Sequence, residues 1–359
     1  MQTVSARVRN NITRTRFALA SARDGSTPVY RQWARLAWLY SVRKFSLREI
    51  CSYDLLRTEA SMTVFASKHE SLQILARINP VDYRCLTENK MIFDAMCQAN
   101  KLSVPHCYGV LSGGRLFDSM VAGATTGSTM ADFSLPANFI AKPVDGAYGK
   151  HVTSWSREDN GWSAHDGERL SGAALKEKLA EVSQGTALIL QERLYAHPDI
   201  EAVSGFPAVQ AARLITLRES GSSSAASILY GTFKLLMQDS VTDNFSFGYS
   251  GNLLCAINIQ TGTLRHAWLR DADTGRLELV THHPITGQAL AGFQIPFWED
   301  IVSLVQRAAD VFHVLPAVGW DVAITPGGVT LLEGNTRWDP PFADLLSRED
   351  WERVCALAR

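Results

Sequence analysis

Apolar residues recur at helical spacing in four parts of the chain. In the segment 30–40, Trp33, Leu36, Ala37 and Tyr40 follow the i, i+3, i+4, i+7 pattern of one face of an amphipathic helix. A second periodic segment begins at Asn89 and is ended by the Ser-Val-Pro turn at 103–105. The same reasoning predicts helices at 172–182 and 298–312.

Short apolar runs separated by turn residues predict strands in the rest of the chain. The predicted strands are 108–111, 138–144, 151–156, 187–194, 211–217, 226–236, 252–259, 263–268 and the two halves of 318–335. The pair around DGAYGK is expected to form a hairpin, and a second hairpin is expected to turn at Pro326-Gly327-Gly328. The second half of the chain is therefore predicted to be an antiparallel sheet, within an α+β fold.

Length and composition indicate a folded protein with more than one domain. The chain has 359 residues, of which 46% are hydrophobic and 20% charged, and its formal net charge is -1. These values are typical of globular proteins and argue against disordered or fibrous classes. A balanced charge also creates no global field that would attract nucleic acid.

The charge is nevertheless uneven, because residues 1–50 hold ten Lys or Arg and only two Asp or Glu. A basic amphipathic helix there can contact membrane phosphates or another anionic polymer. The alternative is a helix that docks on the main body and leaves its basic face in solvent. Both interpretations stay open from the sequence.

The cellular location and the state of the cysteines are predicted from the absence of a long apolar segment and of paired cysteine motifs. Apolar runs are too short to span a membrane, and arginine or asparagine interrupts the first sixteen residues where a secretory signal would need an apolar core. The six cysteines are scattered without a CxxC pair, which favours reduced thiols over a zinc site or disulfides. We expect a cytoplasmic protein without a transmembrane segment.

The last predicted hairpin carries oxygen-bearing side chains that can converge. Asp321 lies on one strand, and Glu333 and Asn335 lie two residues apart on its partner, so they share a face. Carboxylate and amide oxygens suit magnesium, particularly where nucleotide phosphates complete the shell. By itself, the same pattern also fits a solvated strand end.

A turn rich in small residues follows Lys142 at the end of a predicted strand. Gly146 and Gly149 allow backbone N–H groups to approach phosphate oxygens, and Lys142 and Lys150 add positive charge. The turn is not a Walker loop, because His151 follows where Ser or Thr is required. An ordinary hairpin turn is the alternative.

The succession of these segments resembles the ATP-grasp superfamily. The resemblance is carried by TENKMIF, IAKPVDGAYGK, LILQERL and the final hairpin, in this order. The segments QERLYAHPDI, AARLITL, VTDNF, HPITGQALAGFQIPFWE and GWDVAITPGGVTLLEGN resemble more narrowly the sugar-transfer-associated ATP-grasp family. The resemblance runs from about residue 47 to residue 341.

This resemblance implies an ATP-grasp fold, in which two α+β lobes grip ATP, preceded by a basic helical region. The implied division is 1–85 for the basic, mainly helical N-terminal region, 86–193 for the smaller lobe and 194–359 for the larger lobe with the magnesium site. ATP and Mg²⁺ are the implied cofactors.

Several residues match positions that bind the nucleotide in this superfamily. Lys90 and Lys142 match the two lysines that hold its phosphates, and Gly146, Gly149 and Lys150 belong to the loop that covers them.

The segment after the LILQERL strand matches the hinge between the lobes. Gln191, Glu192 and Leu194 are expected beside adenine, and Asp199 or His197 would reach the ribose.

Three further residues match the acceptor side of the site. Arg213 is expected to neutralise the transferring phosphoryl group, Lys234 to assist it, and Asn244 to face the acceptor. Asp321, Glu333 and Asn335 match the magnesium ligands, with Glu333 bridging two ions.

The resemblance implies an ATP-dependent carboxylate–amine ligase that forms an amide through an acylphosphate and releases ADP and phosphate. The expected substrates are a small carboxylate and an amine, either sugar-linked or related metabolites of polysaccharide or secondary metabolism. Two alternatives remain at this stage: an ATP-dependent phosphotransferase acting on a hydroxyl, and a non-catalytic module that binds ATP or a glycan.

Overall fold

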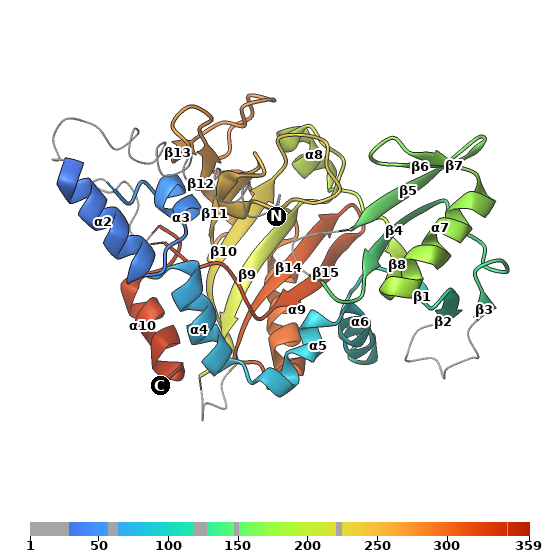
Figure 1. The fold of residues 1–359 in the computed structure, drawn as a ribbon, viewed down its shortest axis with the longest axis horizontal. Coiled ribbons are helices and arrows are strands. Elements are labelled where there is room, and N and C mark those ends of the chain that lie inside the picture. The colour runs from blue at the N-terminus through green and yellow to red at the C-terminus, as the bar shows by residue number, and fades with distance from the viewer. Residues whose placement is uncertain (1–28, 57–63, 118–127, 147–150, 220–224, 343) are drawn as a thin grey trace, which may run out of the picture.

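Two antiparallel sheets form the body of the protein (Figure 1). The computed structural model describes residues 29–56, 64–117, 128–146, 151–219, 225–342 and 344–359. Helices pack on both sheets, so the predicted α+β architecture of two lobes with a helical N-terminal region is confirmed. Within the described residues, no helix has the length and apolar character needed to cross a membrane.

The smaller sheet has eight strands in the order β3-β2-β1-β8-β4-β5-β6-β7. They are β1 Cys107–Ser112, β2 Arg115–Phe117, β3 Ser128–Thr129, β4 Asn138–Pro143, β5 Thr153–Glu158, β6 Gly161–Ala164, β7 Arg169–Leu170 and β8 Leu188–Glu192. The predicted hairpin around residues 144–152 is confirmed by the antiparallel pairing of β4 and β5. Helix α7 (Gly172–Gly185) covers one face through Leu175 and Leu179, which pack with Phe139 and Trp155.

The larger sheet has seven strands in the order β13-β12-β11-β10-β9-β14-β15. They are β9 Ala211–Leu217, β10 Ser227–Leu235, β11 Leu253–Asn258, β12 Thr263–Arg270, β13 Leu277–Val280, β14 Ala317–Thr325 and β15 Gly328–Asn335. Every pairing is antiparallel, and β14 and β15 form the predicted final hairpin. Alternation along β9 and β14 sends successive side chains to opposite faces, which gives this sheet two buried surfaces.

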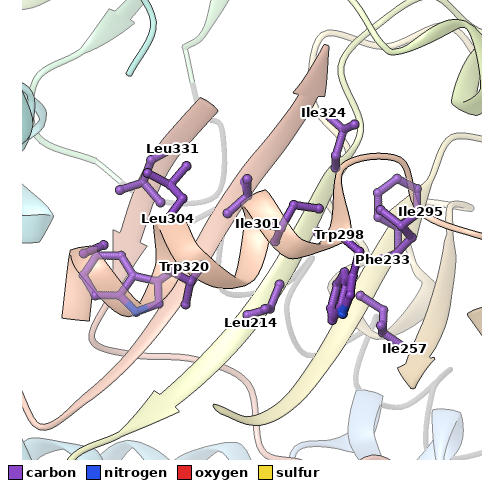
Figure 2. Packing of buried hydrophobic residues seen from close by; sticks show 14 of the residues in the cluster. Leu214, Phe233, Ile257, Ile295, Trp298, Ile301, Leu304, Trp320, Ile324 and Leu331 are labelled. Atoms are coloured by element: carbon purple, nitrogen blue, oxygen red, sulfur yellow. The ribbon is translucent and has the colours of Figure 1, made fainter. Parts of the chain in front are cut away.

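Helix α9 (Trp298–Val311) covers one face of the larger sheet. Figure 2 shows Ile301 and Leu304 of this helix above Leu214 and Trp320 of the sheet. All four side chains are buried, and full burial of each apolar side chain stabilises the fold by roughly 1.5–3 kcal/mol. Helix α6 (Lys90–Ala99) joins the same core.

The other face of the larger sheet is covered by the N-terminal helices and by the C-terminal α10. These are α2 Val29–Ser41, α3 Leu47–Ser52, α4 Lys68–Ile78 and α10 Arg348–Leu357. Helix α5 Cys85–Glu88 instead packs through Leu86 on the core that contains α9. The helix α8 Pro198–Ser204 and the 3-10 helices η1 Val81–Tyr83 and η2 Ser246–Gly248 lie elsewhere. Leu75 of α4 and Trp351 of α10 pack with Ile215 and Trp338. Ser46 and Ser67 begin α3 and α4 with capping boxes, which fixes where each helix starts.

The predicted face of α2 differs from the buried one. The helix forms as predicted, but it buries Gln32, Leu36 and Leu39 and leaves Trp33 and Tyr40 exposed. Helical spacing alone could not choose between these stripes, because Leu and aromatic residues alternate around the helix. Packing against the larger lobe buries the side of the helix that carries Leu36 and Leu39.

The predicted domain boundaries at residues 86 and 194 stay predictions. Phe93 and Cys97 place α6 in the core of the larger sheet, whereas β1 and β8 belong to the smaller sheet. The segment 86–193 therefore contributes to both lobes.

Candidate functional site

A cavity lies between the two sheets and takes its walls from both. One wall consists of β4 and β8 with the beginning of α6, and the opposite wall consists of β10, β14 and β15. The segment 241–244 closes one side. Ile140, Leu194 and Val209 supply apolar surface, so a flat ring can be bound beside the charged groups described next.

A row of charged side chains crosses three neighbouring strands of the larger sheet. Arg213 of β9 lies directly opposite Asp321 of β14, and Asp321 lies opposite Glu333 of β15. The Arg213 Nε and Nη2 groups donate to the two Asp321 carboxylate oxygens at 2.5 and 2.6 Å. A bidentate pair of this kind fixes the arginine geometrically. Arg213 Nη2 also lies 3.6 Å from Glu333 Oε1.

A β-bulge at Leu332 puts Glu333 in this row. Val322 pairs with Leu331 in the core beneath α9, whereas Asp321 pairs with Glu333, so Leu332 has no partner in the register. Regular alternation would place residues 331 and 333 on the same face. The extra residue instead sends Glu333 to the cavity face, which is a common use of bulges beside functional sites.

Lys234 of β10 completes the charge network of the larger sheet. Its Nζ donates to Asp243 Oδ1 at 3.0 Å and to Asp321 Oδ2 at 3.2 Å. Asp243 is held in turn by the backbone N–H of Ala211, which donates to its Oδ2 at 2.8 Å. Burial lowers the pKa of Lys234, but Asp243 and Asp321 outweigh this effect and raise the pKa above its ordinary value.

The same network fixes the charges of Asp321 and Arg213. Burial raises the pKa of the Asp321 carboxyl, yet Arg213 and Lys234 outweigh burial and hold this pKa well below its usual range. Burial also disfavours the Arg213 guanidinium, but Asp321 and Glu333 raise its pKa above the ordinary value. Asp321, Arg213 and Lys234 are therefore charged at neutral pH and form ion pairs within the wall.

The wall of the smaller sheet carries lysines in a different setting. Burial lowers the pKa of Lys142 to about 8, and the attraction of Glu333 only partly opposes this shift. Burial also lowers the pKa of Lys90, whose Nζ donates to the Gly146 carbonyl at 3.1 Å. Both lysines line the cavity. A bound anion would stabilise their charged forms.

Two buried polar atoms near this wall have no hydrogen-bond partner in the described part of the chain. They are Gln191 Oε1, from β8, and Asp94 Oδ1, from α6. Gln191 lines the cavity, where its free acceptor suits the amino group of a bound base. Burial raises the pKa of Asp94 to about 6, and Gln98 donates to its other oxygen at 2.6 Å.

Asp94 and Asp243 were missed by sequence reasoning. The periodic segment that begins at Asn89 forms a helix, and its buried residues in the structure are Phe93, Asp94 and Cys97. The sequence signal for Asp94 was its position directly after Phe93, an apolar residue of the same helix. The sequence signal for Asp243 was its position next to Asn244, the only residue of this segment that was assigned to the site from the sequence.

The donor set at the hairpin fits magnesium. Asp321, Glu333 and Asn335 offer carboxylate and amide oxygens, and the Glu333 side chain is 40% exposed. Asn335 Nδ2 donates to Glu333 Oε1 at 3.0 Å, which places the two side chains together. Asp321 Oδ2 already accepts from both Arg213 and Lys234, so the lone pairs left for a metal lie on Asp321 Oδ1 and on the Glu333 carboxylate. The described residues contain no group of three or more His, Cys, Asp or Glu suited to a metal, so a site here would depend on two acids and one amide.

Most of the predicted site residues that the structure describes line this cavity. They are Lys90, Lys142, Gly146, Gln191, Glu192, Leu194, Lys234, Asn244, Asp321 and Glu333. Arg213 and Asn335 reach the site through their contacts with Asp321 and Glu333. The predictions for Gly149 and Lys150 lie outside the described residues.

The two candidates for ribose contact are not among the cavity-lining residues. His197 begins α8 (Pro198–Ser204), where its Nδ1 accepts the backbone N–H of Asp199 at 3.2 Å. This is the arrangement of a helix cap, and it explains both residues locally. A contact of either residue with ribose stays a prediction.

Comparisons with solved structures give distant likenesses. The L-amino acid ligase from Bacillus licheniformis is 15% identical, with 70% of this chain and 41% of that chain covered and a TM-score of 0.37. The D-alanine–D-alanine ligase from Helicobacter pylori is 10% identical, with 77% and 60% covered and a TM-score of 0.41. The D-Ala:D-Ser ligase VanG from Enterococcus faecalis is 10% identical, with 78% and 64% covered and a TM-score of 0.41. The chain thus spans about two fifths to two thirds of the length of these proteins.

Sequence comparison identifies the family directly. No curated protein matches the chain. The family model described as sugar-transfer associated ATP-grasp matches residues 70–350, which is more than half of the chain. This range includes both sheets and every residue that lines the cavity. The chain belongs to the sugar-transfer-associated ATP-grasp family.

Proposed function

We propose that the protein is an ATP-dependent carboxylate–amine ligase. The observation that carries this proposal is the arrangement of the cavity, where two lysines with lowered pKa values face a row of arginine and carboxylates across the lobes. Phosphoryl transfer from a nucleotide requires positioning and charge neutralisation more than covalent chemistry by the protein. The cavity provides both.

ATP is placed by the unsatisfied groups of the smaller-sheet wall. Lys90 and Lys142 attract the phosphates, because a phosphate oxygen offsets the burial that disfavours their charge. Gln191 Oε1 accepts a hydrogen bond from the exocyclic amine of adenine, beside the apolar side chains of Ile140 and Leu194. Gly146 marks the beginning of the covering loop.

The larger-sheet wall holds the reacting end of the nucleotide. Asp321, Glu333 and Asn335 would hold magnesium, which when bound neutralises phosphate charge and polarises the transferring group. Arg213 is fixed by Asp321 and donates toward the phosphoryl oxygens, where negative charge is greatest during transfer. Lys234 helps to keep Asp321 ionised and holds both Asp321 and Asp243 in place.

The reaction proceeds in two balanced steps. A carboxylate oxygen of the first substrate attacks the terminal phosphorus of ATP, the bond from this phosphorus to the bridging oxygen breaks, and ADP leaves. The amine nitrogen of the second substrate then attacks the acyl carbon of the acylphosphate, the carbon–oxygen bond breaks, and phosphate leaves. The amine enters the second step neutral and loses one further proton as the amide forms. Closure against water protects the acylphosphate from hydrolysis.

The substrates are proposed from the family rather than from the cavity alone. A carboxylated sugar, an amino acid or a related metabolite is the proposed carboxylate, with an amino acid or other amine as acceptor. Asn244 lines the cavity on the side of segment 241–244, where it would contact the acceptor.

Trapping with hydroxylamine tests the proposal. The protein is incubated with ATP, Mg²⁺ and hydroxylamine over a panel of uronic acids, amino acids and small dicarboxylates, and both ADP and hydroxamate are measured. We expect carboxylate-dependent hydroxamate that falls by about two orders of magnitude or more in Glu333→Gln. Glu278→Gln, an exposed glutamate on β13 away from the cavity, is the matched control and should keep full activity.

Other outcomes would replace the ligase proposal. A phosphorylated product without hydroxamate would identify a phosphotransferase acting on a hydroxyl. ATP binding by calorimetry without turnover for any acid would identify a binding module, whereas the absence of ATP binding would refute the placement of the nucleotide itself.

A further inference from the structure

Helix α2 exposes an apolar, largely aromatic face that nothing in the described part of the chain covers. The exposed fraction is 68% for Tyr30, 50% for Trp33 and 52% for Tyr40. These three residues lie along one side of the helix at spacings of three and seven. Trp38 and Val42 extend the exposed apolar surface at the end of the helix. Contiguous apolar surface of this kind marks an interaction site.

The exposed face belongs to a helix that is firmly attached to the body. Leu36 and Leu39 are buried in a core with Tyr53 and Trp268 of the larger lobe. Arg35 Nε donates to the Leu55 carbonyl at 2.6 Å on the same side. The helix is therefore held on one side and presents its aromatic side outward.

Positive charge predominates around this face, although Arg43 is paired with Glu70 of α4. Residues 25–48 contain five Lys or Arg and no Asp or Glu. Arg31 lies over the ring of Tyr30 at 5.9 Å, and Lys44 follows the helix as an exposed residue. Tyrosine and tryptophan beside arginine and lysine are the composition of helices that lie in the headgroup layer of a membrane.

Charge also argues against the two occupants available from the chain itself. Residues 1–28 contain five arginines and one aspartate, so this segment carries the same sign as the face. A second copy packed face to face would bring Arg31 and Lys44 of both copies together, with no acidic residue between positions 25 and 48 to oppose them. Like charges at a contact are unfavourable in both cases.

We propose that the exposed face of α2 docks on an anionic lipid surface. The aromatic rings enter the headgroup layer, and Arg31, Lys44 and the neighbouring basic residues contact lipid phosphates. Figure 1 shows α2 at the opposite end of the molecule from β6 and β7. Docking through α2 therefore leaves the smaller sheet, and the cavity wall that it supplies, away from the lipid.

Vesicle binding by the full chain tests this inference. The protein is mixed with vesicles of phosphatidylcholine alone or of phosphatidylcholine and phosphatidylglycerol in equal amounts, and bound protein is measured by flotation. We expect binding to the anionic vesicles only, weakening as salt rises from about 0.1 to 1 M because the Debye length shrinks. The double variant Trp33→Ser/Tyr40→Ser should bind at least about tenfold more weakly.

A matched variant separates this face from exposed apolar residues in general. Val81 and Tyr83 are 70% and 46% exposed in η1, so Val81→Ser/Tyr83→Ser removes similar surface elsewhere and should bind vesicles like the unchanged protein. Hydrogen exchange on the unchanged protein gives a readout that needs no variant, since residues 29–42 should gain protection when anionic vesicles are added.

Three results would overturn the proposal. The first is equal binding to both vesicles, or binding that Trp33→Ser/Tyr40→Ser leaves unaltered. The second is a sedimentation equilibrium dimer that the double variant dissociates, without vesicle binding, which would assign the face to a second copy. The third is binding of a single-stranded oligonucleotide that depends on Trp33 and Tyr40 in the absence of vesicle binding, which would assign it to nucleic acid.

Discussion

Two lysines face the same cavity from opposite walls, and their surroundings differ. Lys234 lies between Asp243 and Asp321, which raise its pKa above the ordinary value despite burial. Lys142 is half-buried, no carboxylate among the described residues hydrogen-bonds to it, and its pKa falls to about 8. In the wall of the larger sheet, Lys234 is thus already paired with carboxylates of the protein. In the wall of the smaller sheet, Lys142 gains an anionic partner only when a phosphate binds. The first lysine supports the structure of the site, and the second serves its ligand.

Replacing Lys234 by methionine should have the largest effect on stability. The change leaves Asp243 and Asp321 buried with one positive charge fewer, and breaking a buried ion pair on one side costs about 3–5 kcal/mol. We expect the free energy of unfolding in urea, measured without nucleotide, to fall by about 3 kcal/mol.

The matched control for Lys234→Met is Lys176→Met, at a partly exposed lysine that donates to the Ala131 carbonyl. That variant should change the free energy of unfolding by less than about 0.5 kcal/mol. If the two variants lost similar stability, Lys234 would not have the structural role described here.

Lys142 should make ATP binding depend on pH. Its lowered pKa means that the neutral form predominates above about pH 8, so the charge that attracts phosphate is lost there. We expect the dissociation constant of ATP, measured by calorimetry, to rise roughly tenfold for each pH unit above 8. Lys142→Arg keeps its charge over this range and should show a flatter profile.

The folding stability of the nucleotide-free protein should change with pH in the opposite direction to its affinity for ATP. Between about pH 8 and the unfolded-state pKa near 10.5, the unfolded chain binds more protons at Lys142 than the folded one, so this group makes stability rise with pH. Loss of ATP affinity accompanied by loss of folding over the same range would therefore contradict the assignment to Lys142.

Sequence patterns predicted most of the long strands and the hairpin that carries Asp321 and Glu333, but not the helices α4, α8 and α10 or the short strands β2, β3, β6 and β7. Alternating strands and the Pro-Gly-Gly turn predict the β14–β15 hairpin, but the register that starts at Thr325 and Gly328 would by itself place Leu332 opposite Asp321. The bulge at Leu332 was not predictable, because it depends on how Leu331 and Val322 pack beneath α9. The predicted convergence is present, and the bulge is its structural cause.

Long-range packing accounts for what the sequence could not predict. Asp94 is buried because α6 turns Phe93 and Cys97 into the larger core, a choice that the helix pattern leaves open. The same ambiguity gave the wrong buried stripe for α2, where Leu39 is buried in place of Tyr40. In both helices, the spacing of apolar residues predicts that a helix forms. Which side of the helix is buried depends on the surface against which it packs.

A third lysine, Lys68, extends the comparison to an exposed ion pair. Its contribution to the free energy of unfolding should be the smallest of the three. Lys68 Nζ lies 2.6 Å from Asp339 Oδ1, closer than Lys234 lies to either of its partners, but the Asp339 side chain is 49% exposed. Solvent screens such a pair, and exposed pairs contribute about 0–1 kcal/mol. A double-mutant cycle with Lys68→Met and Asp339→Asn should therefore give a coupling energy below about 1 kcal/mol in urea unfolding. A coupling as large as the loss caused by Lys234→Met would mean that distance, rather than burial, governs these pairs, and the distinction between the two cavity lysines would lose its physical basis.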